Sequence, residues 1–278
     1  MTMLSINTNE GALQAAQASY SVNKSMETSM ERLSTGKRVN SSFDDAAGLQ
    51  IIQRMTAEIQ GLRQAGRNAA DAQAMLGTAE GAAKEIGTML LRLREIAVQA
   101  ANGTAEDVGD RAGLAAEFLA LENEIIRISD DTTFGGIELL DGSFSVKTAG
   151  RFQIGADDDQ VITHKIANLA STAIGLVAAI DVTTFTKATS AITTLDKAIS
   201  TLGTARQNIG AVMNRLDHTI ANLAQVATNL SLAKGRIEDA DFAAETSNLA
   251  RTQVLQQASM AMLAQANASK QNILALFQ

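Results

Sequence analysis

Two long runs of this chain place apolar side chains at alternating intervals of three and four residues, and this periodicity limits the fold more than any other feature. The spacing is the seam of a coiled coil, because it keeps one face of each helix against a partner helix. Each run corresponds to a helix on the order of 80 Å long. The first seam, with one slip at Ala69, is formed by Ile52, Met55, Ile59, Leu62, Gly66, Ala69, Ala72, Leu76, Ala79, Ala83, Ile86, Leu90, Leu93, Ala97 and Ala100. The second is formed by Ala188, Ile192, Leu195, Ile199, Leu202, Arg206, Ile209, Met213, Leu216, Ile220, Leu223, Ala227, Leu230, Lys234 and Ile237.

The composition favours long helices packed against one another. The 278 residues include no proline, cysteine or tryptophan, and 3% of them are aromatic. Proline is the strongest helix breaker, so its absence permits uninterrupted helices. We therefore expect a mainly α fold, in which N- and C-terminal helices form a long antiparallel coiled-coil rod with a small β-hairpin region.

Helix ends follow from capping residues. The first helix should run from about Thr8 to Ser34, with Gly36 as the glycine that stops it. The second should open at a capping-box variant, Ser42-x-x-Asp45, which places Asp44 and Asp45 in the positively polarised first turn.

A third, shorter helix should follow the first long one and fold back antiparallel to it. Gly103 ends the long helix, and Thr104-x-x-Asp107 is expected to start the next one. Helical periodicity then returns near Phe185, and the acidic segment 236–242 forms a joint before the final helix.

The segment 132–176 breaks the helical pattern. It contains turn dipeptides at 135–136 and 141–142 and short β-prone stretches, which predict one or two β-hairpins. The three aspartates at 157–159 would suit a cation, but no ligand spacing accompanies them, so a solvated turn is the preferred interpretation.

Both ends of the chain are apolar and almost free of charge. Within Met1–Asn23 the only charged side chain is Glu10, and within Gln253–Gln278 the only one is Lys270. Their apolar residues spread around a helix instead of following one stripe, so a pair of such helices would hide only part of them. Burial of each large apolar side chain contributes roughly 1.5–3 kcal/mol, which favours further copies of the same pair as the cover. The alternative is an ordinary helical pair at the edge of a globular core.

If further copies of the pair cover these residues, both ends of the chain should be disordered in the monomer and helical in a polymer. The side chains expected to form this polymerisation core are Leu4, Leu13, Tyr20, Leu255, Met262, Leu263, Ile273, Leu276 and Phe277.

No arrangement of residues indicates catalysis, a cofactor or a metal site. The two histidines, His164 and His218, lack metal-binding spacing, and no phosphate-binding glycine pattern appears. The net charge of −7 argues against nucleic acid as the main partner. No apolar run reaches the length of a membrane span, and the N-terminus lacks the features of a cleavable signal peptide. We therefore expect a chain that is not an enzyme, and that is either intracellular or exported without such a peptide.

Four stretches of the sequence resemble bacterial flagellins. LSTGKRVNSSFDDAAGLQIIQRM (33–55) is similar to the N-terminal flagellin signature, and IEDADFAAETSNLARTQVLQQASMAMLAQANASKQNILALF (237–277) is similar to the C-terminal one. LRLREIAVQAANGT (91–104) and TTFGGIELLDG (132–142) resemble the flagellin inner rod. Together the resemblance covers nearly the whole chain.

The resemblance implies a structural subunit that polymerises into the bacterial flagellar filament used for swimming. It implies terminal segments, 1–43 and 237–278, that are disordered in the monomer and form the filament core, and a rod domain, 44–236, around them. Only about ten residues separate the β-hairpin region from the returning helix, so the chain resembles a short flagellin with little or no outer domain.

The resemblance also implies partners and a location. These are other copies of the chain in a helical homopolymer, the flagellar type III export apparatus, a flagellin chaperone, and the filament cap and hook-junction proteins. The location implied is the extracellular flagellum.

A host Toll-type receptor binds many flagellins through an arginine, an apolar residue and a glutamate, and Arg92, Ile96 and Glu124 match those positions. Leu91 stands where the strongly recognised members have a glutamine, a departure that counts against recognition. Two other functions stay open at this point: a hook–filament junction protein, which shares the terminal signatures, and a secreted helical adhesin.

Overall fold

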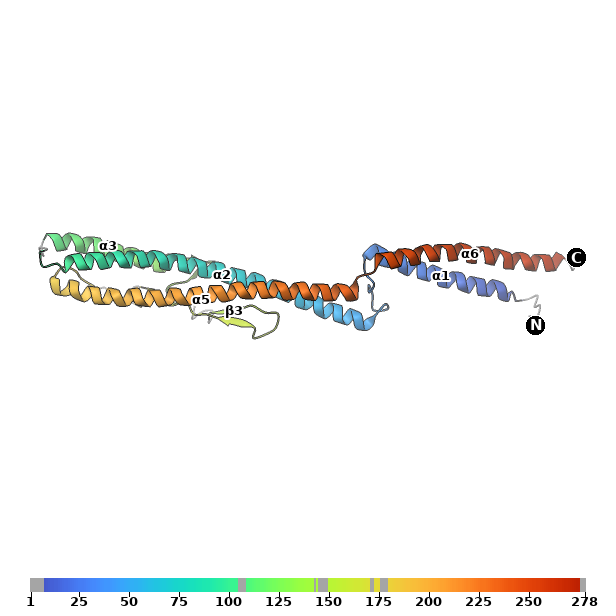
Figure 1. Cartoon of the computed structure of the whole chain (residues 1–278), viewed down its shortest axis with the longest axis horizontal. Coiled ribbons are helices and arrows are strands. Elements are labelled where there is room, and N and C mark those ends of the chain that lie inside the picture. Colours follow the sequence, from blue (N-terminus) through green and yellow to red (C-terminus); the bar gives the residue numbers. More distant parts are fainter. Residues whose placement is uncertain are drawn as a thin grey trace. The chain divides into compact units, whose positions relative to one another are not determined.

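The computed structural model describes residues 8–104, 109–142, 144, 150–170, 173–175 and 180–275, with side chains described up to residue 269. Its helices are α1 (Glu10–Thr35), α2 (Ala46–Ala100), α3 (Asp110–Asp131), α5 (Phe185–Glu238) and α6 (Phe242–Ala275). Its strands are β1 (Thr133–Phe134), β2 (Ile137–Glu138), β3 (Arg151–Gln153) and β4 (Val161–Thr163). The predicted mainly α fold with small hairpins is confirmed (Figure 1).

The chain divides into two compact units. One comprises Met1–Ala57 and Asn229–Gln278, and contains α1 and α6. The other comprises Glu58–Thr228, and contains α3, both hairpins and most of α2 and α5. We describe each unit separately.

In the unit Glu58–Thr228, the long helices α2 and α5 run antiparallel. Arg206 donates two hydrogen bonds to Glu80 Oε1, at 2.9 and 2.6 Å, and Arg94 donates to Asp196 Oδ1 at 2.7 Å. Residue numbers therefore fall along α5 as they rise along α2. The Glu80 partner also explains how a charged residue, Arg206, fits into an otherwise apolar seam.

The core of this unit lies along the predicted seams. Every seam position of α2 from Ala69 to Ala100 is buried, and those of α5 are buried or half-buried. Many of the buried residues are alanines, so the helices approach closely; the Cα of Gly87 is so near that a Cβ there would lie 3.2 Å from Leu202 Cδ2. The 3,4 periodicity thus predicted the packing face of both helices correctly.

Helix α3 folds back along α2 and adds Phe118 and Ile125 to the core. A buried arginine, Arg111, joins the two helices. Its Nε donates to the carbonyl of Ala100 at 2.7 Å, and its Nη2 donates to the carbonyl of Asn102 at 2.8 Å. A guanidinium at this place satisfies carbonyl groups that the end of a helix leaves without an intrahelical partner.

Two hairpins complete the unit, as the sequence predicted. β1 and β2 pair antiparallel across Gly135 and Gly136, which both have positive φ (58° and 80°), as a tight hairpin turn of this kind requires. β3 and β4 also pair antiparallel, and this hairpin packs against α2. At Gly61 of α2 a Cβ would lie 2.9 Å from Ala156 Cβ, and Asn68 Nδ2 donates to the Gln153 carbonyl at 3.1 Å.

The end of α1 agrees with the prediction, whereas the start of α2 does not. Gly36 has φ 71° and its N–H bonds to the Arg32 carbonyl at 2.8 Å, which is the glycine stop expected. Helix α2 begins at Ala46, so Asp45 precedes the first turn. Asp45 Oδ1 caps the helix by accepting from the N–H of Gly48 at 2.8 Å, a role assigned to Ser42 in the prediction. The expected start of α3 at Thr104-x-x-Asp107 lies partly outside the described residues.

The seam register makes a direct prediction for Ala83, which is fully buried on α2. The change Ala83→Glu should lower the free energy of unfolding of the rod by about 3–5 kcal/mol, because it buries an unpaired carboxylate in a tightly packed site. Thermal unfolding followed by circular dichroism measures this effect. The control is Ala70→Glu on an exposed face of the same helix, where we expect little change. Equal melting temperatures for the two variants would contradict the register.

Candidate assembly surface

Helices α1 and α6 pair antiparallel within the unit that contains both ends of the chain (Figure 1). At one end of the pair Asn9 Nδ2 donates to the Ala266 carbonyl at 3.1 Å, and further along Gln256 Nε2 donates to Asn23 Oδ1 at 2.9 Å. Asn9 also caps α1, because its Oδ1 accepts from the N–H of Ala12 at 3.2 Å. Polar side chains therefore fix the register of this pair.

No apolar side chain of the α1/α6 pair is fully buried among the described residues. The buried side chains of the two helices are those of Ser29 and Glu245, which are polar. Small residues such as Ala12 and Ser19 are half-buried. The contact between α1 and α6 therefore removes only part of the pair's apolar surface from water. The larger apolar side chains that are half-buried are Val22, Met26, Leu33, Leu249 and Leu263.

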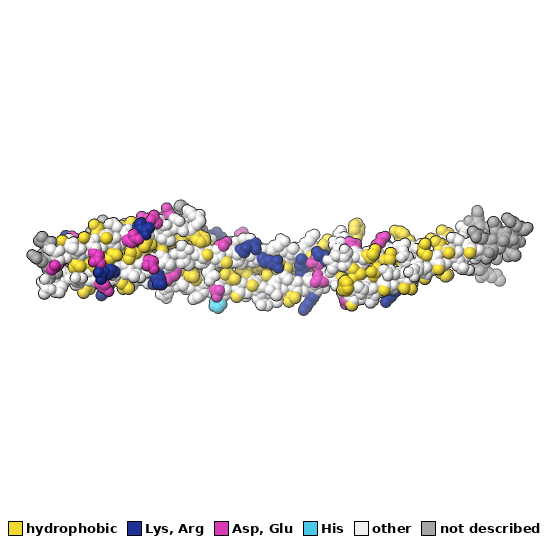
Figure 2. Space-filling model, turned by 90° about the horizontal axis from the view of Figure 1, so that it is seen from above, with side chains coloured by type: hydrophobic (Ala, Val, Ile, Leu, Met, Phe, Trp, Pro, Cys, Tyr) yellow, Lys and Arg dark blue, Asp and Glu magenta, His cyan; other side chains and the backbone are white. Residues whose placement is uncertain are grey.

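Many other large apolar side chains of the pair face outwards. Tyr20 is 72% exposed, Leu13 62% and Met262 64%. Figure 2 shows apolar side chains spread over the surface at the α1/α6 end, with few charged groups among them. We call this exposed apolar surface of α1 and α6 the terminal surface. Its large members are Leu13, Tyr20, Met30, Phe242, Val254, Leu255, Met260 and Met262.

The residues predicted to form the polymerisation core divide into three groups. Leu13, Tyr20, Leu255 and Met262 lie on the terminal surface, and Leu263 is half-buried. The side chains of the others lie outside the described residues; they are Leu4, Ile273, Leu276 and Phe277. The described members thus come from both helices and belong to one paired element.

A buried ionic network holds α1 and α6 together near the chain joint. Arg32 Nη1 donates to Glu245 Oε1 at 2.9 Å, and Ser29 Oγ donates to Glu245 Oε2 at 3.0 Å. Burial alone raises the pKa of Glu245, but the bonds from Arg32 and Ser29 outweigh it and lower that pKa overall. Glu245 is therefore ionised at neutral pH and ties the two helices.

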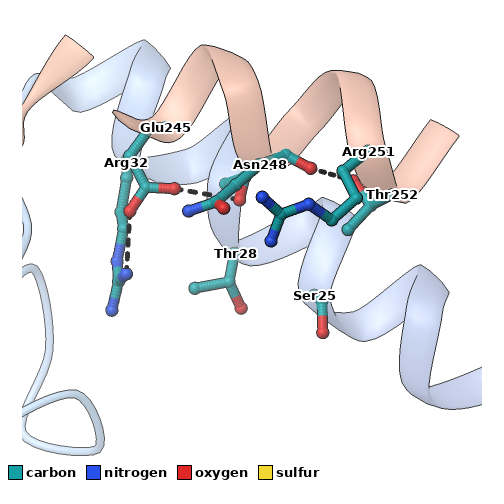
Figure 3. A pocket seen from close by; sticks show the side chains of 8 residues that line it. Ser25, Thr28, Arg32, Glu245, Asn248, Arg251 and Thr252 are labelled. Atoms are coloured by element: carbon teal, nitrogen blue, oxygen red, sulfur yellow. Dashed lines mark hydrogen bonds and ion pairs between the residues drawn. The ribbon is translucent and has the colours of Figure 1, made fainter. Parts of the chain in front are cut away.

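This network borders a polar hollow of about 360 Å³ between the helices (Figure 3). Thr28 and Arg32 approach it from α1, and Glu245, Asn248 and Arg251 from α6. The hollow carries two guanidinium groups and one carboxylate. Thr28 Oγ1 donates to the backbone carbonyl of Lys24 at 3.0 Å, within its own helix, whereas the Ser29 hydroxyl bonds to Glu245 in the network described above.

Next to this network, the segment after α1 is joined to the end of α5. The N–H of Arg38 bonds to the Glu238 carbonyl at 2.6 Å, and the N–H of Ala240 bonds to the Gly36 carbonyl at 3.0 Å. The Glu238 carboxylate lies 2.6 Å from Lys37 Nζ and 3.2 Å from Lys234 Nζ. Burial raises the pKa of Glu238, but hydrogen bonds from the two lysines outweigh it and the pKa is lowered overall. The second charged residue of the α5 seam thus has its partner here.

The residues matched to receptor contacts lie in the other unit and differ in exposure. The Arg92 guanidinium is exposed and bonds to Glu117 at 2.9 and 2.7 Å, and Glu124 pairs with Arg127 at 2.6 Å. Ile96 is fully buried in the core. The structure therefore brings Arg92 and Glu124, but not Ile96, to the surface.

Sequence reasoning missed the polar groups that position the terminal helices. Ser29 and Arg32 each lie more than two hundred residues from Glu245 along the chain, so no local motif indicates their contact.

The described residues offer no other site of known type. No group of three or more His, Cys, Asp or Glu side chains is placed to hold a metal ion in the described part of the chain. None of the helices described combines the length and apolar character of a bilayer-spanning segment.

Comparison with known proteins agrees with this architecture. The family model of the bacterial flagellin N-terminal helical region matches residues 6–145, and that of the flagellin C-terminal helical region matches residues 192–277. Only residues 146–191 lie between the two matches, so the chain is short, with little middle domain.

Individual relatives cover almost the whole chain. A flagellin of Halalkalibacterium halodurans is 44% identical over 250 residues, covering 90% of each chain. A flagellin of Bacillus subtilis is 38% identical over 302 aligned positions, covering 98% of this chain and 99% of its own. The crystal structure of Bacillus cereus flagellin superposes with a TM-score of 0.50 at 32% identity, covering 60% of this chain and 94% of its own. This chain therefore belongs to the bacterial flagellin family, and is a non-enzymatic filament subunit of the extracellular bacterial flagellum.

Proposed function

We propose that this flagellin assembles by ordering its α1/α6 pair against the same pair in neighbouring copies, so that the terminal surface becomes the interior of the filament. One observation carries the proposal: the described part of the pair fully buries no apolar side chain, while many of its large apolar side chains are exposed. Removing these side chains from water on assembly would supply the cohesion that the isolated pair lacks.

The cost of ordering explains why the pair should depend on neighbours. Fixing the backbone of each residue costs roughly 1–2 kcal/mol, and this applies to the 26 residues of α1 and the 34 residues of α6. In the isolated pair, helical hydrogen bonds, one small ionic network and partial apolar burial must offset that cost without a fully buried apolar core. Isolated helices without a packed face are marginally stable in water. The terminal segments 1–43 and 237–278 would therefore be disordered in the monomer and ordered in the filament.

The same balance favours growth at an existing tip. A new subunit that adds to a tip finds ready-made apolar surface, whereas two free monomers must order both of their terminal pairs at once. Small nuclei are then unfavourable and long filaments are favoured.

The rod domain, proposed at 44–236, would stay folded throughout because it has its own core. The boundaries between the two compact units, at Ala57/Glu58 and Thr228/Asn229, lie inside these proposed limits of the rod domain. Both boundaries fall within continuous helices, α2 and α5.

Further partners follow from the family and from the exposed terminal surface. A flagellin chaperone would cover the C-terminal apolar side chains before assembly, and the export apparatus would pass an unfolded chain. Cap and hook-junction proteins would meet the same surface at the two ends of the filament. Recognition by a Toll-type receptor stays a prediction, and with Ile96 in the core it would have to rest on Arg92 and Glu124.

The first test replaces an exposed apolar side chain of α6 by a charge. Leu255 is 46% exposed, so Leu255→Asp should leave the thermal unfolding of the rod unchanged. It should raise the critical concentration for seeded filament growth at least 10-fold, because a carboxylate would then be buried between copies. Sedimentation and electron microscopy measure filament yield. The matched control is Gln257→Asp, which adds the same charge at an exposed polar position of the same helix. Normal growth of Leu255→Asp would rule out this side chain as a buried contact.

The second test concerns the pH dependence of the ionic network. The pKa of Glu245 is lowered in the ordered pair, so its contribution is fully present above its ordinary value of 4.5 and is lost as the pH falls through the lowered value. Glu245→Gln should weaken assembly at pH 7 by about 1–2 kcal/mol, or roughly 5- to 30-fold in critical concentration. It should also make the acid-induced loss of filaments less steep. Glu27→Gln, at an exposed glutamate of α1, is the control. A Glu245→Gln variant with wild-type acid sensitivity would contradict this role of the network.

A further inference from the structure

An aromatic side chain stands fully in solvent on the short segment between α1 and α2. Phe43 is 99% exposed, more than any other large apolar side chain that the structure describes. Single exposed apolar residues are common on protein surfaces and need no explanation by themselves. Phe43 differs because the turn that carries it is held in place by several hydrogen bonds.

The turn is closed by the neighbouring carboxylate, Asp44. Its Oδ2 accepts from the N–H of Ser41 at 2.8 Å, from Ser41 Oγ at 3.0 Å and from the N–H of Asn40 at 3.2 Å. The Asp44 N–H in turn bonds to the Ser41 carbonyl at 3.2 Å. Asn40 Nδ2 also donates to Glu31 Oε1 at 2.5 Å, which fixes the turn beside the last turns of α1. Once the terminal segments have ordered in a growing filament, this turn holds the phenyl ring in a fixed position, so a neighbouring copy can bury the ring at little further cost in conformational entropy.

A matching cavity lies at the other end of the same helix. A hollow of about 450 Å³ opens between α1 and α6, and its lining combines small residues with the polar side chains of Gln14, Gln265 and Ser269. The small residues are Gly11, Ala15, Ala18 and Ala266. Met262, 64% exposed, forms one wall. Methionine adapts its shape readily and makes favourable contacts with aromatic rings.

One copy of the chain cannot place its own Phe43 in this hollow. Helix α1 has 26 residues, so its two ends lie on the order of 40 Å apart. The ring is fixed near one end and the hollow lies near the other. A contact between different patches on two copies joins subunits head to tail, and it repeats into an open polymer when the rotation between copies does not close a ring.

We propose that Phe43 of each subunit inserts into the Gly11–Met262 hollow of a neighbouring subunit, as a directional contact of the filament. This inference rests on the proposed assembly through the terminal surface, and adds to it a specific ring, a specific receiving site and a polarity. The occupant of the hollow is a second copy of this chain.

Cross-linking tests the contact, because the natural chain contains no cysteine. Phe43→Cys and Ala18→Cys proteins are mixed, assembled onto wild-type seeds and treated with a short bis-maleimide, which spans the extra length of the missing ring. The mixture should give a covalent dimer on a denaturing gel, and neither protein alone should do so. A chain that carries both changes should give a ladder of higher oligomers. Phe43→Cys mixed with Ala70→Cys, on an exposed face of α2, is the control and should give no product.

Each outcome decides between the contact and its alternatives. Filaments of normal appearance without the Phe43→Cys/Ala18→Cys product would overturn the insertion while leaving the proposed function intact. A dimer from Phe43→Cys alone would show a symmetric contact, and would also overturn it. Failure of the wild-type chain to form filaments, even with seeds, would refute the proposed function and the inference with it.

A second measurement does not depend on cross-linking. Phe43→Ser should raise the critical concentration about 10- to 100-fold, because a buried ring is lost. Phe43→Leu should restore most of the loss, and the melting of the rod should not change in either variant. Ala18→Phe, which fills the hollow from an exposed position, should have the same effect as Phe43→Ser. Wild-type growth of both Phe43→Ser and Ala18→Phe would exclude the contact.

Discussion

The contact between α1 and α6 fully buries polar side chains but no apolar one, and the assembly that we propose for the chain follows from that composition. Hydrogen bonds such as those of Asn9 and Asn23 fix which residues meet, and the Arg32–Glu245 pair fixes the end near the joint. These interactions give the pair a defined geometry but contribute little net stability, because hydrogen bonds to water are exchanged for hydrogen bonds within the protein. The stabilising apolar burial is left to be completed by other molecules.

The second unit shows the opposite arrangement with the same kinds of residues. There the 3,4 seams of α2 and α5 face each other, and α3 adds Phe118 to a continuous core. Charged residues that interrupt a seam are paired, as Arg206 is with Glu80. In the assembly that we propose, the unit with α2, α3 and α5 is stable alone, while the α1/α6 pair completes its packing only against other copies. Such a division suits a filament subunit, which must remain folded as a monomer without polymerising prematurely.

Much of the fold could be predicted from the sequence because helix periodicity is a local property. The two long helices, the glycine stop at Gly36 and both hairpins appear where the pattern placed them. The start of α2 was misplaced because Ser42 and Asp45 both suit a cap, and only the three-dimensional turn shows that Asp45 makes the bond. The sequence shows that the two ends are rich in apolar residues, but it does not show which way those side chains face. That the pair turns polar groups such as Ser29 and Glu245 inward depends on contacts between residues far apart in the chain, which a single sequence does not reveal.

Hydrogen exchange on monomer and filament tests the central claim most directly. The amides of Glu10–Thr35 and Phe242–Ala275 are compared with those of residues 69–100, which lie in the core of the other unit and serve as an internal reference. In the monomer, we expect fast exchange for both terminal helices and strong protection of the reference residues. In the filament, we expect strong protection of all three segments. Terminal helices protected in the monomer as strongly as residues 69–100 would show that the α1/α6 pair is stable by itself, and would contradict the account.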